Sequence, residues 1–315
     1  MNQRTLGRTQ LHVAELCLST APLGRVDDAA AFALLDTYQA AGGNFIQSPG
    51  FCPNADALPP IGTAPEDVVG RWRETRAIGR DRVVLATRVK FVRPAHGGSI
   101  AFANTIRESC ERSLQRLRTR HLDLLICDWD EGLLPVDDVL DAVDRLIRAG
   151  LVRYAVAGDF PPWRIVDSLH RSSARNRVRF EALQGGYSLL TRARFEAEAL
   201  AMCREHRLGF LARSPLAGGS LAAPFDGLYP AGSPHAAVLA VLSDLAHRRG
   251  VSPARIALAW VLRQPEVSSA LVSTTSPREL NDLSHATRLV LDHDEIEALA
   301  EVTSVPDERM ELRPA

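Results

Sequence analysis

Cysteine is scarce in this chain, and its distribution argues against two kinds of site. None of the cysteines forms a CxxC pair, and none has a histidine at the spacing typical of metal ligands. Because their number is odd and their spacing irregular, we expect free thiols, mostly buried, instead of a disulfide framework. They are Cys17, Cys52, Cys110, Cys127 and Cys203. The sequence therefore predicts no metal site.

Long apolar runs and an excess of charge of one sign are also absent. No stretch approaches the roughly 20 continuous apolar residues of a membrane span, and the first residues lack the apolar run of a signal peptide. The 37 basic and 38 acidic residues give a formal net charge of −1, which offers no electrostatic surface to nucleic acid or an anionic membrane. We expect a cytoplasmic protein whose partner is a small molecule.

One pattern repeats along the chain. Short apolar runs rich in Val, Ile, Leu and Phe alternate with helical stretches whose apolar residues recur every 3 or 4 positions. The runs are ELCLST, NFIQS, RVVLATRV, LDLLICDW, VRYAVAGD, RFEALQG, GFLARSP and SSALVST. Eight such units predict an α/β fold of the (β/α)8 TIM-barrel type, because a doubly wound sheet more often stops at five or six strands.

Three segments fall outside the repeat. Residues 3–14 hold a Gly-Arg turn between strand-like runs and predict an N-terminal β-hairpin that closes the bottom of the barrel. Residues 216–235 are rich in Gly, Ala and Pro and predict a long loop after the seventh strand. The stretch LDHDEIEALAEVTS predicts an extra C-terminal helix. With no linker or low-complexity tract between these parts, we expect residues 1–315 to form a single domain.

Charged and polar residues at the C-terminal ends of the expected strands mark a candidate site. Active sites of (β/α)8 barrels lie at these strand ends and in the loops that follow them. Each of these residues taken alone is equally well explained as a solvent-exposed residue at the rim of the barrel. Their convergence on one mouth favours an active site. They include Gln47, Arg88, Lys90, Asp128, Asp159, Gln184 and Arg213.

The motifs of this chain resemble one known family. Their order and spacing are similar to those of the aldo-keto reductase superfamily over nearly the whole chain, through MNQRTLGRTQLHVAEL, APLG, AAGGNFI, VVGRW, DRVVLATRV, SCERSLQRLRTRHLDLL, LIRAGLVRYAV, YSLL and SPLAGG. The resemblance implies a (β/α)8 barrel that binds NADP(H) without a Rossmann motif. It also implies hydride transfer to a carbonyl, with a tyrosine as proton donor supported by a lysine, an aspartate and a histidine.

The catalytic tetrad that the resemblance implies is replaced at all four positions. Gln47, which carries no charge, stands at the aspartate position after NFI, and Cys52 at the tyrosine position five residues further on. Arg88 in LATRV takes the lysine position, and Asp128 in ICDW the histidine position. A thiol close to a guanidinium ionises readily, and a thiolate does not donate the required proton. Arg88 is expected instead to pair with Asp128 across adjacent strands and keep that carboxylate ionised as a base.

Lys90, the sole lysine of the chain, leaves a second proton source open. Because side chains alternate along a strand, residues 88 and 90 share one face of the expected third strand, with Lys90 one layer nearer the mouth. Lys90 is then either a displaced catalytic lysine or a lysine that reaches from the strand end to solvent.

The cofactor positions that the resemblance implies are partly retained. Gln184 keeps the glutamine that holds the nicotinamide amide, whereas Gly158 and Asp159 replace a Ser-Asn pair after the fifth strand. Arg213 replaces the aromatic residue that stacks on the nicotinamide, where its charge repels the oxidised ring. The SPLAGG loop offers backbone amides for a pyrophosphate, and the last loop offers a cation for a phosphate. These candidates are Ser214, Leu216, Gly218 and Arg278. NADP(H) binding stays an open alternative.

Three readings of function follow from these residues. The first is an enzyme that performs dehydration, isomerisation or cyclisation without net redox change, with Asp128 as base and Arg88 and Arg213 as anion stabilisers. Cys52 is then a weak acid or a bystander. The second keeps NADP(H) and hydride transfer, with Lys90, Cys52 or water as proton donor. The third is a non-catalytic binding or accessory protein, although drift after lost catalysis would also introduce apolar residues into this polar basin.

Overall fold

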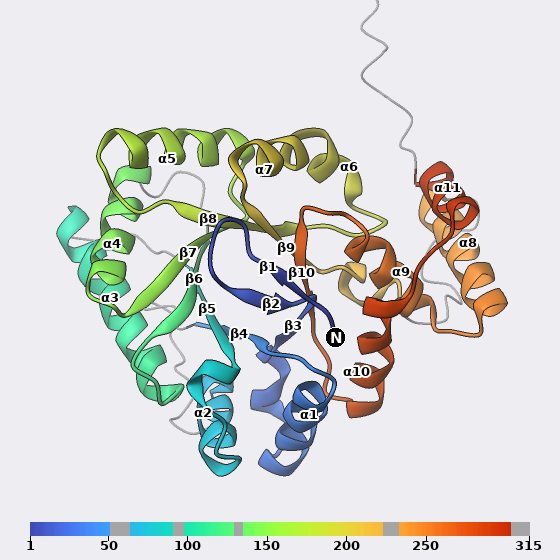
Figure 1. Ribbon diagram of the computed structural model, residues 1–315, viewed down its shortest axis with the longest axis horizontal. Helices are drawn as coiled ribbons and strands as arrows, with labels where there is room; N and C mark the ends of the chain where they lie inside the picture. Colours follow the sequence, from blue (N-terminus) through green and yellow to red (C-terminus); the bar gives the residue numbers. More distant parts are fainter. Residues whose placement is uncertain (51–63, 91–97, 129–134, 223–232, 304–315) are drawn as a thin grey trace, which may run out of the picture.

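Eight parallel strands form a closed barrel at the centre of the molecule (Figure 1). The computed structural model describes residues 1–50, 64–90, 98–128, 135–222 and 233–303, apart from the side chains of Lys90 and Arg194. The barrel strands are β3 (Leu16–Ser19), β4 (Phe45–Pro49), β5 (Val84–Lys90), β6 (Leu122–Asp128), β7 (Val152–Gly158), β8 (Phe180–Gly186), β9 (Gly209–Arg213) and β10 (Val267–Val272). Because β10 pairs with both β9 and β3, the sheet has no free edge. The (β/α)8 barrel predicted from the eight apolar runs is confirmed.

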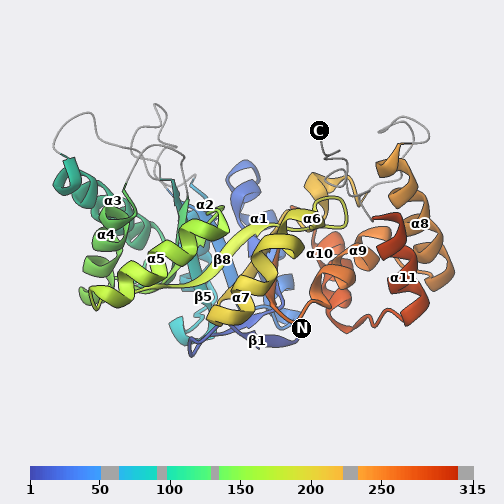
Figure 2. The same ribbon diagram turned by 90° about the horizontal axis from the view of Figure 1, so that it is seen from above.

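Helices surround the barrel and follow its strands (Figure 2). They are α1 (Asp28–Ala40), α2 (Pro65–Thr75), α3 (Gly98–Arg116), α4 (Val136–Arg148), α5 (Pro162–Ala174), α6 (Arg192–Arg194), α7 (Leu200–His206), α8 (Pro234–Arg249), α9 (Pro253–Leu262), α10 (Pro277–Ser284) and α11 (His293–Val302). In α4 the buried side chains Val136, Val139, Leu140 and Val143 recur at the helical period and form the stripe that faces the barrel. None of the helices in the described ranges has the length and apolar character needed to cross a bilayer.

The predicted C-terminal helix is α11, which packs beside α8 at one end of the molecule (Figure 2). Its start is fixed by a capping box. The Asp292 side chain accepts a hydrogen bond from the backbone amide of Glu295, and the Glu295 side chain accepts one from the amide of Asp292. This reciprocal arrangement satisfies two amides at the helix N-terminus and stabilises the helix at its first turn.

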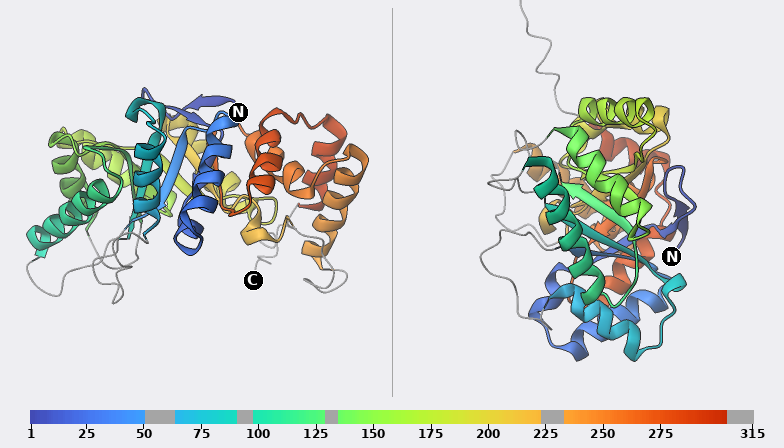
Figure 3. Two further views of the ribbon diagram at one scale, coloured as in Figure 1. Left: turned by 90° about the horizontal axis from the view of Figure 1, so that it is seen from below. Right: turned by 90° about the vertical axis from the view of Figure 1, so that its left-hand side faces the viewer.

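The N-terminal hairpin covers the end of the barrel where the strands begin (Figure 3). Its strands β1 (Gln3–Thr5) and β2 (His12–Ala14) pair antiparallel, as the sequence predicts. Leu6, Leu11 and Val13 are buried against the inward side chains of the barrel. Gly7 is required in the turn, because its φ is +52° and a Cβ there would lie 2.6 Å from the carbonyl oxygen of Glu181. The bottom of the barrel is therefore closed by apolar packing.

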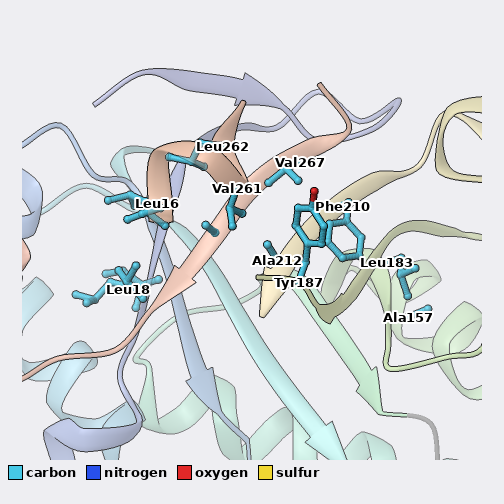
Figure 4. Packing of buried hydrophobic residues seen from close by; sticks show 14 of the residues in the cluster. Leu16, Leu18, Ala157, Leu183, Tyr187, Phe210, Ala212, Val261, Leu262 and Val267 are labelled. Atoms are coloured by element: carbon cyan, nitrogen blue, oxygen red, sulfur yellow. The ribbon is translucent and has the colours of Figure 1, made fainter. Parts of the chain in front are cut away.

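The core consists of two apolar layers. The outer layer lies between strands and helices, and Figure 4 shows part of it, including Tyr187 and Phe210, whose ring centroids lie 6.2 Å apart. The inner layer fills the barrel itself with Phe45, Val84, Ala86, Leu124, Ile126, Val156, Ala182 and Leu211. Because the lower part of the barrel is filled, a ligand can approach the barrel interior only from the C-terminal ends of the strands.

Candidate active site

Polar side chains replace the apolar filling where the strands reach the mouth. Asp128 at the end of β6 lies in register with Gly158 at the end of β7, and Gly158 in register with Gln184 on β8. Arg88 on β5 is paired with Ile126, two residues below Asp128 on β6. The barrel register therefore brings Asp128, Gly158 and Gln184 from three strands to one level, and Arg88 lies two residues lower on β5.

Four charged residues form a continuous chain of ion pairs, which we call the mouth ion-pair chain. The Nε of Arg88 lies 2.7 Å from Oδ1 of Asp128 and donates a 2.8 Å hydrogen bond to its Oδ2. The Nη2 of Arg88 donates to Oδ2 of Asp159 at 2.7 Å. Arg213 donates from Nη2 to Oδ1 of the same carboxylate at 3.0 Å. Two carboxylates and two guanidinium groups thus balance their charges across the mouth.

The amides of Gln47 and Gln184 lie beneath this chain and bond to each other. Gln184 donates from Nε2 to Oε1 of Gln47 at 2.7 Å, and Arg88 donates from Nη1 to Oε1 of Gln184 at 3.2 Å. Both glutamine side chains are buried. Gln47 therefore anchors Gln184, and through Gln184 it is linked to Arg88.

Burial raises the pKa of Asp128 above its usual value. Its Oδ1 is buried and accepts no hydrogen bond within the described residues, because it lies off the N–H direction of Arg88. Arg88 pulls the pKa down, but burial outweighs this effect, and the nearby charge of Asp159 adds to the rise. Pairing alone led us to expect a carboxylate held in its ionised form. The structure adds desolvation, which pushes the pKa in the opposite direction.

The backbone at two strand ends adopts conformations that few residues tolerate. Asp159 has φ +55° while its amide donates to the carbonyl of Gln184 at 2.8 Å, and Ser214 has φ +53°. Left-handed backbone in residues other than glycine is strained and clusters at binding and catalytic sites. The strain therefore coincides with the residues that carry or adjoin the mouth ion-pair chain.

Two of the predicted catalytic candidates cannot be placed in this arrangement. Cys52 lies outside the described residues, and so does the side chain of Lys90, whose backbone ends β5 in register with Asp128. Within the described ranges, the tyrosines bond elsewhere. Tyr38 hydrogen-bonds to the backbone of β3 and β4, and Tyr187 donates to Glu196. Tyr154 packs against the inner apolar layer.

Comparison with known proteins assigns the chain to a family. Residues 15–304 match the model of the Aldo/keto reductase family. The chain belongs to the aldo/keto reductase family. The resemblance inferred from the motifs is thereby confirmed.

Relatives of this aldo/keto reductase family member match most of its length. The "Uncharacterized oxidoreductase YrpG" of Bacillus subtilis is 30% identical, over 97% of both chains. "Protein tas" of Escherichia coli is 29% identical, over 97% of this chain and 99% of its own. The "Norsolorinic acid reductase" of Aspergillus flavus is 26% identical, over 91% of this chain and 76% of its own. Two of these three names describe an oxidoreductase or a reductase.

The nicotinamide end of the cofactor that this family generally uses does not fit the side chains at the mouth in their present arrangement. The amide of Gln184, which would hold the carboxamide, is already engaged by Gln47 and Arg88. Arg213, which the resemblance places at the stacking position, is held in its ion pair with Asp159. A carboxamide would have to displace buried hydrogen bonds, and a cationic ring would lie against a guanidinium.

Two backbone amides of the SPLAGG loop close a turn within the loop itself. Ala217 donates its amide to the carbonyl of Ser214 at 2.8 Å, and Gly219 donates to Leu216 at 2.9 Å. Gly218 lies between them with φ +68° in a short 3-10 turn (Ala217–Gly219). The amides that close this turn belong to Ala217 and Gly219, and the contacts of Ser214, Leu216 and Gly218 with a pyrophosphate stay a prediction.

The remaining cofactor candidate, Arg278, is suited to an anion. It is exposed in the first turn of α10, where the side chain of Ser276 caps the helix by accepting from the amide of Glu279. No described side chain pairs with Arg278. A helix N-terminus and a guanidinium together favour a phosphate. The described residues therefore fit the phosphate end of a dinucleotide better than its nicotinamide end.

Metal ligands do not gather in the described part of this family member. No three His, Cys, Asp or Glu side chains there are close enough to hold an ion.

Sequence reasoning overlooked the role of Gly158, treating it only as a replaced serine. A Cβ at this position would lie 2.5 Å from Oδ1 of Asp128. The aspartate at the end of one strand and the glycine in register on the next are the signal that points to this close contact.

Proposed function

We propose that this aldo/keto reductase family member catalyses proton transfer without net redox change on a small carbonyl-type substrate bound at the barrel mouth. Dehydration, isomerisation and cyclisation all belong to this class. The observation that carries the proposal is Asp128, which is largely buried, is held by Arg88 and has a raised pKa. A carboxylate whose pKa lies above that of free aspartate is better matched to accept and return a proton near neutral pH.

The proposed reaction begins when Asp128 removes the proton next to the substrate carbonyl. The electron pair of the C–H bond moves toward the carbonyl oxygen, which becomes an enolate. Arg88 uses three of its five N–H donors for Asp128, Gln184 and Asp159, so two remain for this oxygen. Fixed donors in a partly buried site stabilise such developing charge strongly. Return of the proton at another atom gives isomerisation, and transfer of the same proton from Asp128 to a departing β-hydroxyl, which leaves as water, gives dehydration.

The side chains that would hold the nicotinamide ring are already bonded to other residues of the mouth, and this supports the proposal over ordinary carbonyl reduction. Gln184 and Arg213 would both have to leave their present partners before the ring of the cofactor could lie between them. Proton transfer needs no such rearrangement, because Asp128 and Arg88 are already positioned by each other. The replacement of the family tetrad also removes the tyrosine that reduction would use.

The proposal is tested by exchange of substrate protons with deuterium. We would incubate the protein without added nicotinamide in D2O with a panel of small aldehydes, ketones and oxo acids, and follow loss of the α-proton by NMR. Asp128→Asn should slow the exchange at least about 100-fold, the usual contribution of a general base. Asp244→Asn on α8, which removes an equal charge from an exposed pair with Arg248, is the matched control. Equal exchange rates in Asp128→Asn and the wild type would refute the proposal.

A second candidate function is NADP(H)-dependent oxidoreduction with an atypical proton donor. It is favoured by the reductase names of the relatives and by the exposed, unpaired guanidinium of Arg278 among the described residues. NADPH titration followed by its fluorescence discriminates the two candidates. Tight binding that weakens in Arg278→Gln, together with NADPH oxidation in the presence of the carbonyl panel, would favour this function over redox-neutral chemistry.

A further inference from the structure

Asp159 occupies a position between two guanidinium groups that is shaped for a carboxylate. Its Oδ2 accepts from Arg88 at 2.7 Å, and its Oδ1 accepts from Arg213 at 3.0 Å. The two arginines come from β5 and β9, on different sides of the mouth. Guanidinium groups recognise carboxylates through parallel N–H donors, so any carboxylate that reached this position would meet the same pair of partners.

The outer pair of the mouth ion-pair chain is the one that a ligand can replace. The side chains of Asp159 and Arg213 are 35% and 37% exposed, whereas those of Arg88 and Asp128 are 22% and 18% exposed. Exposed ion pairs contribute little to stability, so exchanging the partner of Arg213 costs little.

Arg213 has a donor that its present partner does not use. Its Nε is buried and makes no hydrogen bond within the described residues, while Nη2 alone bonds to Asp159. A buried charged donor without an acceptor is unfavourable. A carboxylate that accepts from Nε and Nη2 together would satisfy it through the two-pronged geometry that arginine prefers.

An apolar recess adjoins the same position. A cavity of about 120 Å³ is lined by Asp159 together with Phe160, Leu183, Phe195 and Phe210. An apolar cavity of about 150 Å³ is large enough for benzene, so this recess suits a shorter group of a few carbon atoms. Asp159 is common to the recess and to the mouth ion-pair chain, whereas Leu183 and Phe210 belong to the outer layer between strands and helices and not to the barrel mouth.

We infer that the substrate carries a carboxylate that displaces Asp159 from Arg213. The substrate class is a short-chain oxo acid, and Asp159 acts as an internal stand-in for its carboxylate. This inference rests on the proposed proton-transfer function, because Arg88 and Asp128 then face the carbonyl beside that carboxylate.

The inference is tested by calorimetric binding of 2-oxovalerate and of 2-pentanone, in which a methyl group replaces the carboxylate. The oxo acid should bind at least tenfold more tightly than the ketone. Arg213→Gln should weaken oxo acid binding at least tenfold and leave the ketone unchanged. Asp159→Asn should tighten oxo acid binding about fivefold or more, since the competing carboxylate is gone and asparagine tolerates the left-handed backbone. Asp244→Asn should change neither affinity.

Binding and chemistry are separated by measuring affinity in the Asp128→Asn background as well. Unchanged or weaker oxo acid binding in Asp159→Asn would overturn the inference, and so would equal affinity for the ketone. Oxo acid binding as expected without any Asp128-dependent proton exchange would refute the proposed function and leave the carboxylate site standing. If Arg213→Gln fails to fold, Arg213→Lys replaces it. That variant keeps the charge but loses the paired donors, so binding should weaken at least threefold, and unchanged binding would contradict the inference.

Discussion

Replacement of Gly158 is predicted to destabilise the protein, because Asp128 occupies the space that a side chain at this position would need. A Cβ at this position would lie 2.5 Å from Oδ1 of Asp128 and 3.2 Å from the carbonyl oxygen of Cys127. Gly158 is not among the glycines with positive φ, so its backbone accepts alanine. The substitution Gly158→Ala therefore tests side-chain space alone and forces the Asp128 carboxylate to move.

The expected magnitude follows from two opposing effects. Moving Asp128 breaks its hydrogen bond to Arg88, and a bond between charged groups contributes about 1.5–3 kcal/mol. Replacing glycine by alanine in a strand contributes about 0.5–1 kcal/mol in the other direction. Gly158→Ala should therefore lower the free energy of unfolding by about 1–2 kcal/mol, and it should also slow the Asp128-dependent proton exchange.

The same substitution in an Asp128→Ala variant tests whether contact with Asp128 is the cause of the effect. In Asp128→Ala the carboxylate is gone, so adding Gly158→Ala should raise the free energy of unfolding by about 0.5–1 kcal/mol. The wild type, both single variants and the double variant form a cycle whose coupling energy should be about 1.5–3 kcal/mol, measured by chemical denaturation. Equal destabilisation by Gly158→Ala in both backgrounds would show that contact with Asp128 is not the reason for the glycine.

Two further predictions concern residues outside the mouth. Burial raises the pKa of Glu66, although Thr87 donates to it at 3.0 Å. The favourable contribution of Glu66 to the free energy of unfolding is complete below the pKa of glutamate in the unfolded chain, about 4.3. This contribution is lost as the pH rises through the higher pKa of Glu66 in the folded protein. The melting temperature of Glu66→Gln should therefore rise relative to the wild type from about pH 4 upward, and a pH-independent difference would contradict this. The buried hydroxyl of Tyr38 bonds to the carbonyl of Leu16 at 2.6 Å and accepts from the amide of Phe45 at 3.1 Å. Tyr38→Phe should lower the unfolding free energy by about 1–3 kcal/mol in denaturant titrations, and an unchanged midpoint would refute this account.

The barrel strands could be predicted closely from the sequence. The run RVVLATRV became β5 (Val84–Lys90), and LDLLICDW became β6 (Leu122–Asp128). Both faces of a parallel strand are covered, one by the barrel interior and one by helices, so such strands read as continuous apolar runs bounded by polar residues. The hairpin and the last helix were predictable for a similar reason, because their turn and capping signals are local.

The candidate site was only partly predictable. The pair of Arg88 and Asp128 could be anticipated, since both lie near the ends of neighbouring strands with a known alternation of side chains. The bonds from Arg213 to Asp159 and from Gln184 to Gln47 join residues 54 and 137 positions apart. No local pattern specifies such pairs. They form because the barrel closes and brings strand ends together around one mouth.

Local patterns along the chain were enough to predict the barrel, the family and the polar residues at the strand ends. Which charges meet, and in which direction the pKa of Asp128 moves, became evident only from the folded arrangement. The reason is physical: apolar periodicity is a property of neighbouring residues in the chain, whereas desolvation and ion pairing depend on every atom that surrounds a group in space.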